Sequence, residues 1–222
     1  MIAANHSPLS HLAIRRLLRY RRVLTEAYKQ GTATVFSHQI ASMCGRNNAY
    51  GGSAQVRRDL MHLGCEGKPN SGYNIESVLS ELETFLAPDI TSTALIGVGH
   101  LGKALLRHFT QEHAGFSVVA AFDCDPEKID RVISGCHIFS LDRFAIVAQE
   151  MNITQIMLAV PSSVSQQVVD QTSGCGVKSI VNFTSLPLSV PSGVFVENVD
   201  LIASVEVAAF LGKQIQLSRG AP

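Results

Sequence analysis

The sequence predicts an α/β protein with a helical N-terminal domain, a second domain built on a parallel sheet, and a C-terminal helix. Three observations carry this prediction. Helical segments fill residues 1–87, apolar strands alternate with helices over 90–199, and a last apolar helical segment lies in 200–222. Ala87-Pro88-Asp89 is a natural boundary, because the residue before a proline disfavours helix. We therefore expect domains at 1–87 and 90–199, followed by a helix in 200–222.

The charge is also divided unevenly along the chain. The 222 residues hold 18 basic and 18 acidic side chains, so the formal net charge is zero. Up to Lys68, however, ten side chains are basic and three are acidic, which gives +7, and the remainder carries −7. Clustered positive charge is typical of proteins that bind nucleic-acid phosphates. The zero sum therefore hides a basic N-terminal domain, and two halves of opposite sign suggest two tasks.

The composition argues against several classes of protein. A hydrophobic content of 46% with 16% charged residues argues against disorder. No apolar run reaches the roughly 18 residues of a membrane span, and a basic stretch, Arg15 to Arg22, follows the N-terminus in place of a secretory signal. The five cysteines are scattered and form no C-x-x-C, which indicates reduced thiols in a cytoplasmic protein. His6, His11, His38 and His137 lack metal-ligand spacing with a cysteine or an acid, so we expect no metal.

The N-terminal domain has the pattern of a helix-turn-helix followed by a wing. The predicted elements are helices at Leu9 to Gln30, around Ile40, over AQVRRDLMHL, and around Ile75 to Leu86, with a wing at Cys65 to Gly72. Ser53 is expected to cap the third helix, and Gly64 to end it. Three short helices before a Gly-, Pro- and Asn-rich stretch match the plan of a winged helix.

The third of these helices carries the adjacent bases Arg57 and Arg58. Arginine pairs with guanine or neutralises phosphate, and Ser53 and Gln55, near the helix N-terminus, are placed to meet base edges. A solvated basic face is the alternative interpretation. The pair lies in the +7 segment with helix-turn-helix spacing, so we predict that this helix binds DNA.

The parallel-sheet domain opens on a glycine motif, Gly97-Val98-Gly99-His100-Leu101-Gly102. It follows the strand TALIGV and begins a helix. Gly97 permits a tight turn, Gly99 lets a pyrophosphate approach the backbone, and Gly102 allows close helix–strand packing. Asp123 ends the next strand, 21 residues beyond the motif, where a carboxylate would bind a ribose diol and repel the 2′-phosphate of NADP. The set predicts a Rossmann domain that binds NAD(H). A glycine turn that binds nothing, or binds coenzyme A, is the alternative.

With both motifs in place, the chain resembles the Rex family of redox-sensing transcriptional repressors from about Leu12 to Leu211. The matching stretches are SAQVRRDL, GCEGKPNSGY, ALIGVGHLGKALL, VVAAFDCDPEKI, MLAVPS, IVNF and VPSGVFVENVDL, in the order of the family. The resemblance implies a winged-helix domain, a Rossmann domain and a homodimer with exchanged C-terminal helices. It also implies a repressor that senses the NADH/NAD⁺ ratio and leaves a pseudopalindromic operator in double-stranded DNA when NADH binds.

The resemblance also implies roles for individual residues. It places Arg57 and Arg58 on the recognition helix and Lys68 in the wing. Around the adenine side of the cofactor it places Gly97 to Gly102, Asp123 and Lys128, and toward the nicotinamide Pro161, Asn182 and Asp200. His108 stands where many relatives carry a tyrosine of the switch, whose suggested partners, Arg22 and Asp200, are present. The loop Gly45 to Gly52 is about five residues longer than is usual in the family.

Two rival functions use the same Rossmann domain: an NAD-dependent oxidoreductase and a coenzyme A-binding regulator. The oxidoreductase is disfavoured, because the chain after Val98 leaves no room for a substrate domain and no tyrosine has a lysine four residues later. Asp123 favours a dinucleotide over coenzyme A. The sequence thus predicts a regulator and not an enzyme.

Overall fold

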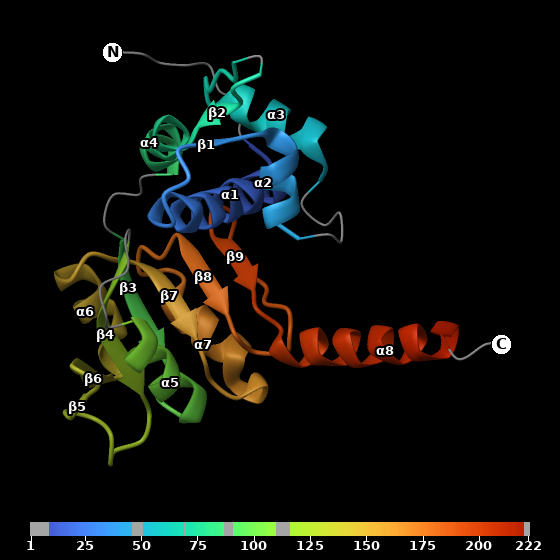
Figure 1. Ribbon diagram of the computed structural model, residues 1–222. Coiled ribbons are helices and arrows are strands. Elements are labelled where there is room, and N and C mark those ends of the chain that lie inside the picture. The colour runs from blue at the N-terminus through green and yellow to red at the C-terminus, as the bar shows by residue number, and fades with distance from the viewer. Residues whose placement is uncertain (1–8, 46–50, 69, 87–90, 110–115, 220–222) are drawn as a thin grey trace. The chain divides into compact units, whose positions relative to one another are not determined.

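A computed structural model describes residues 9–45, 51–68, 70–86, 91–109 and 116–219 (Figure 1). The chain divides into two compact units, Met1–Ala87 and Pro88–Pro222, and each is described by itself. The predicted boundary at Ala87-Pro88-Asp89 and most of the long loop Gly45 to Gly52 lie outside the described residues.

The first unit consists of four helices and a small sheet. Its elements are α1 (His11–Lys29), β1 (Thr34–Val35), α2 (Ser37–Met43), α3 (Ser53–His62), β2 (Tyr73–Asn74) and α4 (Ile75–Leu86). The strands β1 and β2 pair antiparallel, and an isolated bridge joins Lys68 to Gly72 just before β2. The helices α2 and α3, followed by the bridged turn from Lys68 to Gly72 and by β2, give the expected winged-helix plan.

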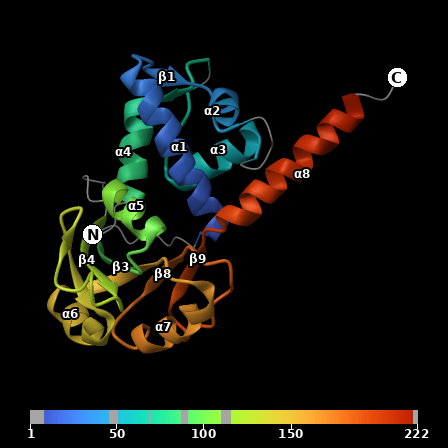
Figure 2. The ribbon, with the colours of Figure 1, turned by 90° about the horizontal axis from the view of Figure 1, so that it is seen from below.

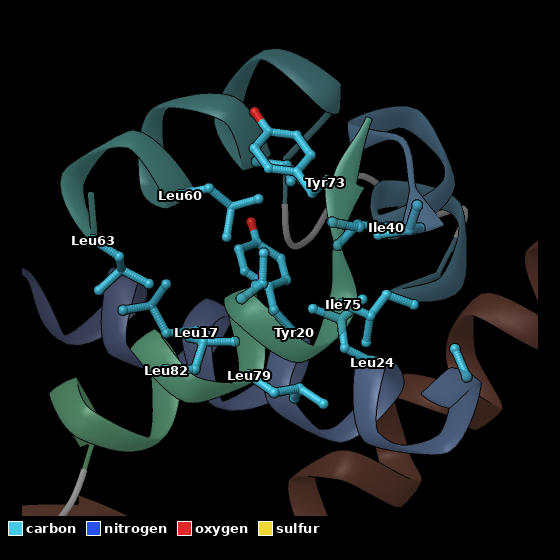
Figure 3. Close-up of a cluster of buried hydrophobic side chains, with 14 of the residues drawn as sticks. Leu17, Tyr20, Leu24, Ile40, Leu60, Leu63, Tyr73, Ile75, Leu79 and Leu82 are labelled. Atoms are coloured by element: carbon cyan, nitrogen blue, oxygen red, sulfur yellow. The ribbon is translucent and has the colours of Figure 1, made fainter. Parts of the chain in front are cut away.

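Side chains from all four helices enclose one apolar core (Figure 3). The fully buried Leu17, Tyr20 and Leu24 line one face of α1 at helical spacing. They meet Val56 and Leu60 of α3, which lie four residues apart and are also fully buried. This packing fixes which face of α3 turns inward, and so which face remains available to a ligand.

The expected cap of α3 is wrong by one residue. Gly52, in an extended conformation, is the cap, and its carbonyl accepts hydrogen bonds from the backbone of Gln55 and Val56. Ser53 is the first helical residue, and no side chain caps this helix. Glycine and serine are both common at a helix N-cap, so the sequence alone does not decide whether Gly52 or Ser53 is the cap.

The second unit is a seven-stranded sheet in the order β5-β6-β4-β3-β7-β8-β9. The strands are β3 (Thr91–Ile96), β4 (Phe116–Asp123), β5 (Val132–Ile133), β6 (Cys136–Ser140), β7 (Ile153–Leu158), β8 (Ser179–Asn182) and β9 (Phe195–Asn198). All pair parallel except β5, which pairs antiparallel with β6. The four strands expected from apolar runs are β3, β4, β7 and β8. The remaining three are β5 and β9 at the two edges of the sheet, and β6 next to β5. Shorter and more polar strands suffice there.

Helices cover both faces of this sheet, as its near-continuous apolar strands require. Helices α6 (Phe144–Glu150) and α7 (Ser165–Thr172) pack on the face that carries Ala94 and Ile96. Helix α5 (His100–Phe109) packs on the opposite face through Leu106, which contacts Leu95. The order with β3 between β4 and β7 puts the carboxyl ends of β3, β4 and β7 side by side, where Rossmann folds bind their ligands.

Helix α8 (Leu201–Arg219) follows β9 and projects away from the sheet (Figures 1 and 2). Large apolar side chains on it are half or more exposed in this single chain: Leu201, Ile202, Val205, Val207, Phe210, Leu211 and Ile215. They are distributed around the helix, so no single face would bury them all. An apolar surface of this extent is typical of an interaction site.

Candidate DNA interface and dinucleotide site

The outer face of α3 presents the predicted DNA-binding arginines. Arg57 and Arg58 are both exposed, while Val56 before them and Leu60 after them are buried. The Nη1 of Arg57 donates a hydrogen bond of 3.3 Å to Oγ of Ser37, the first residue of α2. One arginine is therefore tied to the preceding helix, and the other extends from α3 without such a tie among the described residues.

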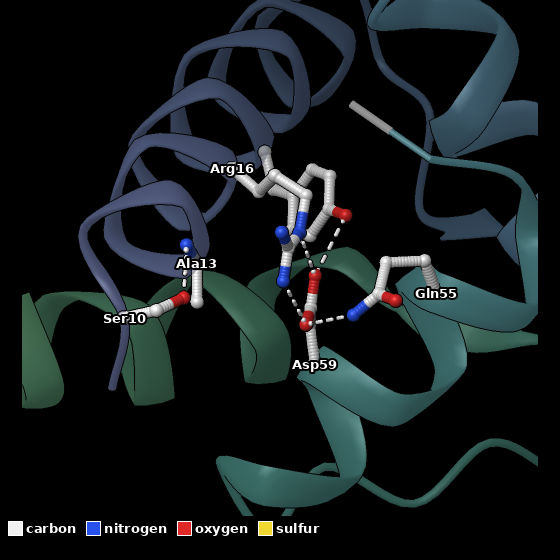
Figure 4. A network of polar contacts seen from close by, with 6 residues as sticks. Ser10, Ala13, Arg16, Gln55 and Asp59 are labelled. Carbon is white, nitrogen blue, oxygen red and sulfur yellow. Dashed lines mark hydrogen bonds and ion pairs between the residues drawn. The ribbon is translucent and has the colours of Figure 1, made fainter. Parts of the chain in front are cut away.

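A buried carboxylate lies behind this face. Asp59, 8% exposed, accepts two hydrogen bonds from the guanidinium of Arg16, at 2.7 Å from Nε and 2.8 Å from Nη2 (Figure 4). The hydroxyl of Tyr20 donates to Oδ2 at 2.9 Å, and Nε2 of Gln55 donates to Oδ1 at 2.7 Å. Two donors belong to α1 and one to α3, so the carboxylate joins the two helices. A two-pronged guanidinium contact fixes direction as well as distance.

These hydrogen bonds decide the charge of Asp59. Burial would raise the pKa of Asp59, but the bonds from Arg16, Gln55 and Tyr20 outweigh burial and hold the pKa below its ordinary value. Burial, reinforced by the neighbouring Asp59, raises the pKa of Tyr20. At neutral pH the pair is therefore a carboxylate that accepts and a phenol that donates.

The wing brings a further base to this unit. Lys68 is exposed, and its backbone forms the bridge with Gly72 that closes the turn. Asn70, at φ 64°, occupies the left-handed region in that turn, which asparagine tolerates better than most residues. A Cβ on Gly72 would lie 2.5 Å from the carbonyl oxygen of Val35, so glycine is required where the wing meets β1.

In the second unit the three motif glycines have the expected separate roles. Gly97 has φ 94°, and a Cβ there would meet the carbonyl oxygen of Ala159 at 2.5 Å. A Cβ on Gly102 would lie 2.0 Å from the carbonyl oxygen of Gly97. A Cβ on Gly99, in contrast, would meet nothing within 4 Å. The first and third glycines are thus required by packing, and the second borders open space at the start of α5.

The carboxylate of Asp123 lies against this glycine turn. Asp123 ends β4, is 9% exposed, and accepts hydrogen bonds from the backbone N–H of Val98 at 2.8 Å and of Asp125 at 2.9 Å. Nζ of Lys128 lies 3.2 Å from carboxylate oxygens of both Asp123 and Asp125. Asp123 thereby holds the turn that begins at Gly97.

The environment of Asp123 keeps it ionised. Burial would raise its pKa, but the backbone N–H groups of Asp125 and Val98, together with Lys128, lower the pKa below its usual value. A fixed negative charge beside the glycine turn suits a ribose diol and disfavours a phosphate on the same ribose. These residues fit the adenosine half of NAD(H): the turn and the N–H groups of α5 for the pyrophosphate, and Asp123 for the ribose.

Asn182 has a structural role that the sequence did not indicate. It is fully buried at the end of β8, and its Nδ2 donates to the carbonyl of Leu186 and to Oδ1 of Asn198. Its Oδ1 accepts from both N–H and hydroxyl of Thr184. All four hydrogen-bonding positions of this amide are filled within the chain. Asn182 shapes the loop after β8, and a direct contact with nicotinamide stays a prediction.

The remaining predicted residues lie in both units. Pro161 is exposed at the carboxyl end of β7, and Asp200 caps α8, with its carboxylate accepting from the N–H of Ala203 at 2.9 Å. His108 is exposed in the last turn of α5 and stacks edge-on against Phe109. Arg22 is exposed on α1 of the first unit. Since Arg22 lies in a different unit from His108 and Asp200, their joint action as a switch stays a prediction.

The sequence interpretation included Gln55 but missed Asp59 and its partners on α1, Arg16 and Tyr20. Arg16 and Asp59 are 43 positions apart, a distance that no local pattern spans. One signal was present: Asp59 follows Val56 by three positions, so helical geometry puts a carboxylate on the buried face of α3. A buried carboxylate needs a partner, and the arginine-rich first helix was the obvious source.

Over the residues that the structure describes, two kinds of feature are absent. No group of three or more His, Cys, Asp or Glu side chains is arranged to hold a metal ion. No described helix is both long and apolar enough to cross a membrane.

The fold and the two sites together define a class of protein: a regulator with a helix-turn-helix unit and a Rossmann-type unit. Family models agree with this division. Residues 9–60 match the model described as "Putative DNA-binding protein N-terminus", and residues 88–186 match the one described as "CoA binding domain".

Similar proteins give the family. The redox-sensing transcriptional repressor Rex of Solidesulfovibrio magneticus is 34% identical over 89% of this chain and 88% of that protein. Rex of Maridesulfovibrio salexigens is 35% identical over 89% and 92%. Among solved structures, the Rex-family repressor RSP, at 28% identity, superposes with a TM-score of 0.83 over 96% of this chain and 98% of RSP. RSP in complex with β-NAD⁺ and operator DNA gives a TM-score of 0.84. The chain belongs to the Rex family of redox-sensing transcriptional repressors.

Proposed function

We propose that this protein is a transcriptional repressor that binds operator DNA through α3 and the wing, and that NADH releases it. The observation that carries the proposal is the Asp123-anchored glycine turn in the same chain as a helix with two exposed arginines. The solved structures of RSP with β-NADH, and with β-NAD⁺ and operator DNA, support both ligands.

Each group of residues has a task in this function. Arg57, Arg58 and Lys68 neutralise phosphates or pair with guanine, and Ser53 and Gln55 lie in the first turn of α3, from which base edges are read. Gly97 to Gly102 present backbone N–H groups to a pyrophosphate. The backbone N–H groups of Asp125 and Val98, together with Lys128, keep Asp123 charged and in place for a ribose diol. Bound NAD(H) supplies the redox signal, and the chain supplies two states that bind it differently.

The exposed apolar helix α8 supports a homodimer, with α8 exchanged between protomers in the manner implied by the family. Two copies related by a two-fold axis would present two α3 helices, which matches a pseudopalindromic operator. We infer domains at 1–87 and 90–199 with the dimerisation helix in 200–222. A reducing cytoplasm suits the five free cysteines, of which Cys124 is exposed.

The test is DNA binding with and without the nucleotide. Duplexes enriched from a randomised pool by the full-length protein would be labelled and titrated by gel shift. We expect NADH to release the DNA at a concentration that leaves NAD⁺, NADPH and acetyl-CoA without effect. Release by acetyl-CoA and not NADH would favour the coenzyme A-binding regulator, to which the family model over 88–186 points. Steady consumption of NADH by the protein would favour an oxidoreductase.

Asp123→Ala tests the cofactor half separately. Loss of the carboxylate removes the ribose acceptor and frees the N–H of Val98. We expect NADH affinity in calorimetry to fall at least tenfold, about 1.4 kcal/mol, while DNA binding without NADH is retained. An unchanged affinity would refute the role of Asp123.

A further inference from the structure

We propose that Asp59 is a positioning residue for sequence recognition, which fixes the amide of Gln55 so that its carbonyl oxygen reads a base edge. This inference rests on the proposed function, because it assigns a contact within the α3–DNA interface. Asp59 is buried on the inner face of α3, so it does not itself reach a base edge.

The hydrogen bond between Gln55 and Asp59 settles which way the amide points. An ionised carboxylate only accepts, so the group that faces Oδ1 at 2.7 Å is the Nε2 amine of Gln55. The two bonds from Arg16 and the one from Tyr20 hold the carboxylate in its plane and leave Oδ1 directed at Gln55 (Figure 4). The side chain of Gln55, normally free to rotate, is thus held from behind.

The other end of the amide is presented outward. Figure 4 shows Oε1 of Gln55 on the side away from Asp59, and within the described residues nothing donates a hydrogen bond to it. Gln55 is the third residue of α3 and half-exposed, in the turn that enters the major groove in helix-turn-helix proteins. An orphan acceptor on a fixed arm therefore lies where a base edge is expected.

The chemistry of the acceptor predicts its target. In the major groove only adenine N6 and cytosine N4 donate hydrogen bonds, while guanine offers acceptors and thymine an acceptor and a methyl group. Gln55 should therefore prefer adenine or cytosine at one position of each half-site. Arg57 and Arg58, which only donate, should prefer guanine or contact phosphate at other positions.

The experiment compares base preferences of full-length variants selected from a randomised duplex pool. Gln55→Leu should lose the preference at one base pair of each half-site, by roughly tenfold to a hundredfold, and keep the others. Asp59→Asn should lose the preference at the same base pair. Four donated hydrogen bonds would compete for the single acceptor oxygen of asparagine, so the amide of Gln55 would no longer have one fixed orientation. Glu76→Gln, which removes one exposed carboxylate from the same domain, is the matched control and should select the wild-type sites. The double variant should lose no more than Gln55→Leu alone.

Several results would overturn the proposal. If Asp59→Asn retained a preference that Gln55→Leu abolishes, Asp59 would not position Gln55. Every base pair contains one amine donor, adenine N6 or cytosine N4, so the sensitive pair is also tested with that amine removed (2-aminopurine for adenine, 2-pyrimidinone for cytosine). If the wild type bound this duplex as tightly as the unmodified one, the outward acceptor would be wrong. The test of the outward acceptor needs only the wild type and Gln55→Leu, so it can be made even if circular dichroism shows that Asp59→Asn does not fold. If the wild type enriched no sequence, the proposed function itself would fail, an outcome distinct from both.

Discussion

At the scale of single residues, each site depends on one carboxylate that is buried and yet ionised. Asp59 joins α1 to α3, and Asp123 joins the end of β4 to the glycine turn. In both cases burial alone would favour the neutral acid, and hydrogen bonds from the chain reverse that preference. A charge held in this way resists displacement, because each donor would otherwise be left unpaired.

The ion pair of Asp59 makes the stability of the first unit depend on pH. The folded pKa of Asp59 is depressed, so its stabilisation is complete above the unfolded pKa of about 4 and is lost as pH falls through the folded value. Asp59→Asn should lower the free energy of unfolding by roughly 2 kcal/mol at neutral pH, less than for a fully buried pair since Arg16 is 17% exposed. Thermal unfolding of both proteins between pH 3 and 7 measures this. We expect the difference to shrink below about pH 4, and a difference independent of pH would contradict it.

The glycines of the motif give opposite predictions for the same substitution. Gly102→Ala drives a Cβ into the carbonyl of Gly97 and should destabilise the second unit by about 2 kcal/mol or more. Gly99→Ala meets no atom within 4 Å and should leave the unfolding temperature within a degree or two, about 0.5 kcal/mol. NADH affinity should nevertheless fall in Gly99→Ala, because the methyl group occupies the path of the pyrophosphate. Calorimetric unfolding and an NADH titration distinguish the two variants, and an unchanged affinity in Gly99→Ala would exclude close approach at that position.

At the scale of elements, the predictable parts are those whose pattern is local. The helices α1, α3 and α4 and the strands β3, β4, β7 and β8 bury a continuous or periodic set of side chains and were predicted. Strands β5, β6 and β9 were missed. β5 has two residues, β6 mixes buried and half-buried positions, and β9 lies at the sheet edge with Phe195 half-exposed. Their pairing, and not their own sequence, makes them strands.

Helix α8 gives a prediction at this scale. Phe210 is 62% exposed in one chain, so Phe210→Glu should leave the fold of a single protomer unchanged. If α8 is buried in a homodimer, the same substitution puts an unpaired charge in an apolar interface and should produce monomers. Sedimentation at several concentrations measures the mass. Gln216→Glu, which adds the same charge at an exposed polar position of α8, is the control and should remain dimeric.

At the scale of the whole molecule, the proposed function requires coupling between two units that fold around separate cores. If NADH weakens operator binding a hundredfold, the coupling free energy is about 2.7 kcal/mol, within the ordinary range for allostery. By thermodynamic linkage, saturating operator DNA should then weaken NADH binding by the same factor. Fluorescence titration of NADH with and without the selected duplex measures this, with a scrambled duplex as control. Equal affinities in the two titrations would exclude this mechanism.

The opposite charges of the two units also belong to this scale. The basic residues up to Lys68 and the acidic remainder cancel in the whole chain, so its net charge is uninformative about DNA. Electrostatic attraction to phosphate falls off within about 10 Å at ordinary ionic strength, so the charge of the nearest unit decides binding. An acidic second unit would keep its own surface off the DNA and leave contact to α3 and the wing.

The strand–glycine–helix motif with its acid, the arginine pair on a short helix, and a change from helices to alternating strands and helices could all be predicted from the sequence. Each of these is local: apolar period, turn chemistry and spacing along the chain are enough to specify them. The hydrogen-bond partners of the buried polar groups, in contrast, follow from the tertiary structure alone. In the folded chain Asp59 binds Arg16 and Tyr20, and the carbonyl oxygen of Gln55 points away from Asp59. All four hydrogen-bonding positions of the Asn182 amide are occupied. Such contacts join residues distant in the chain or depend on side-chain direction, and the cost of an unpaired buried group, rather than any pattern in the sequence, selects them.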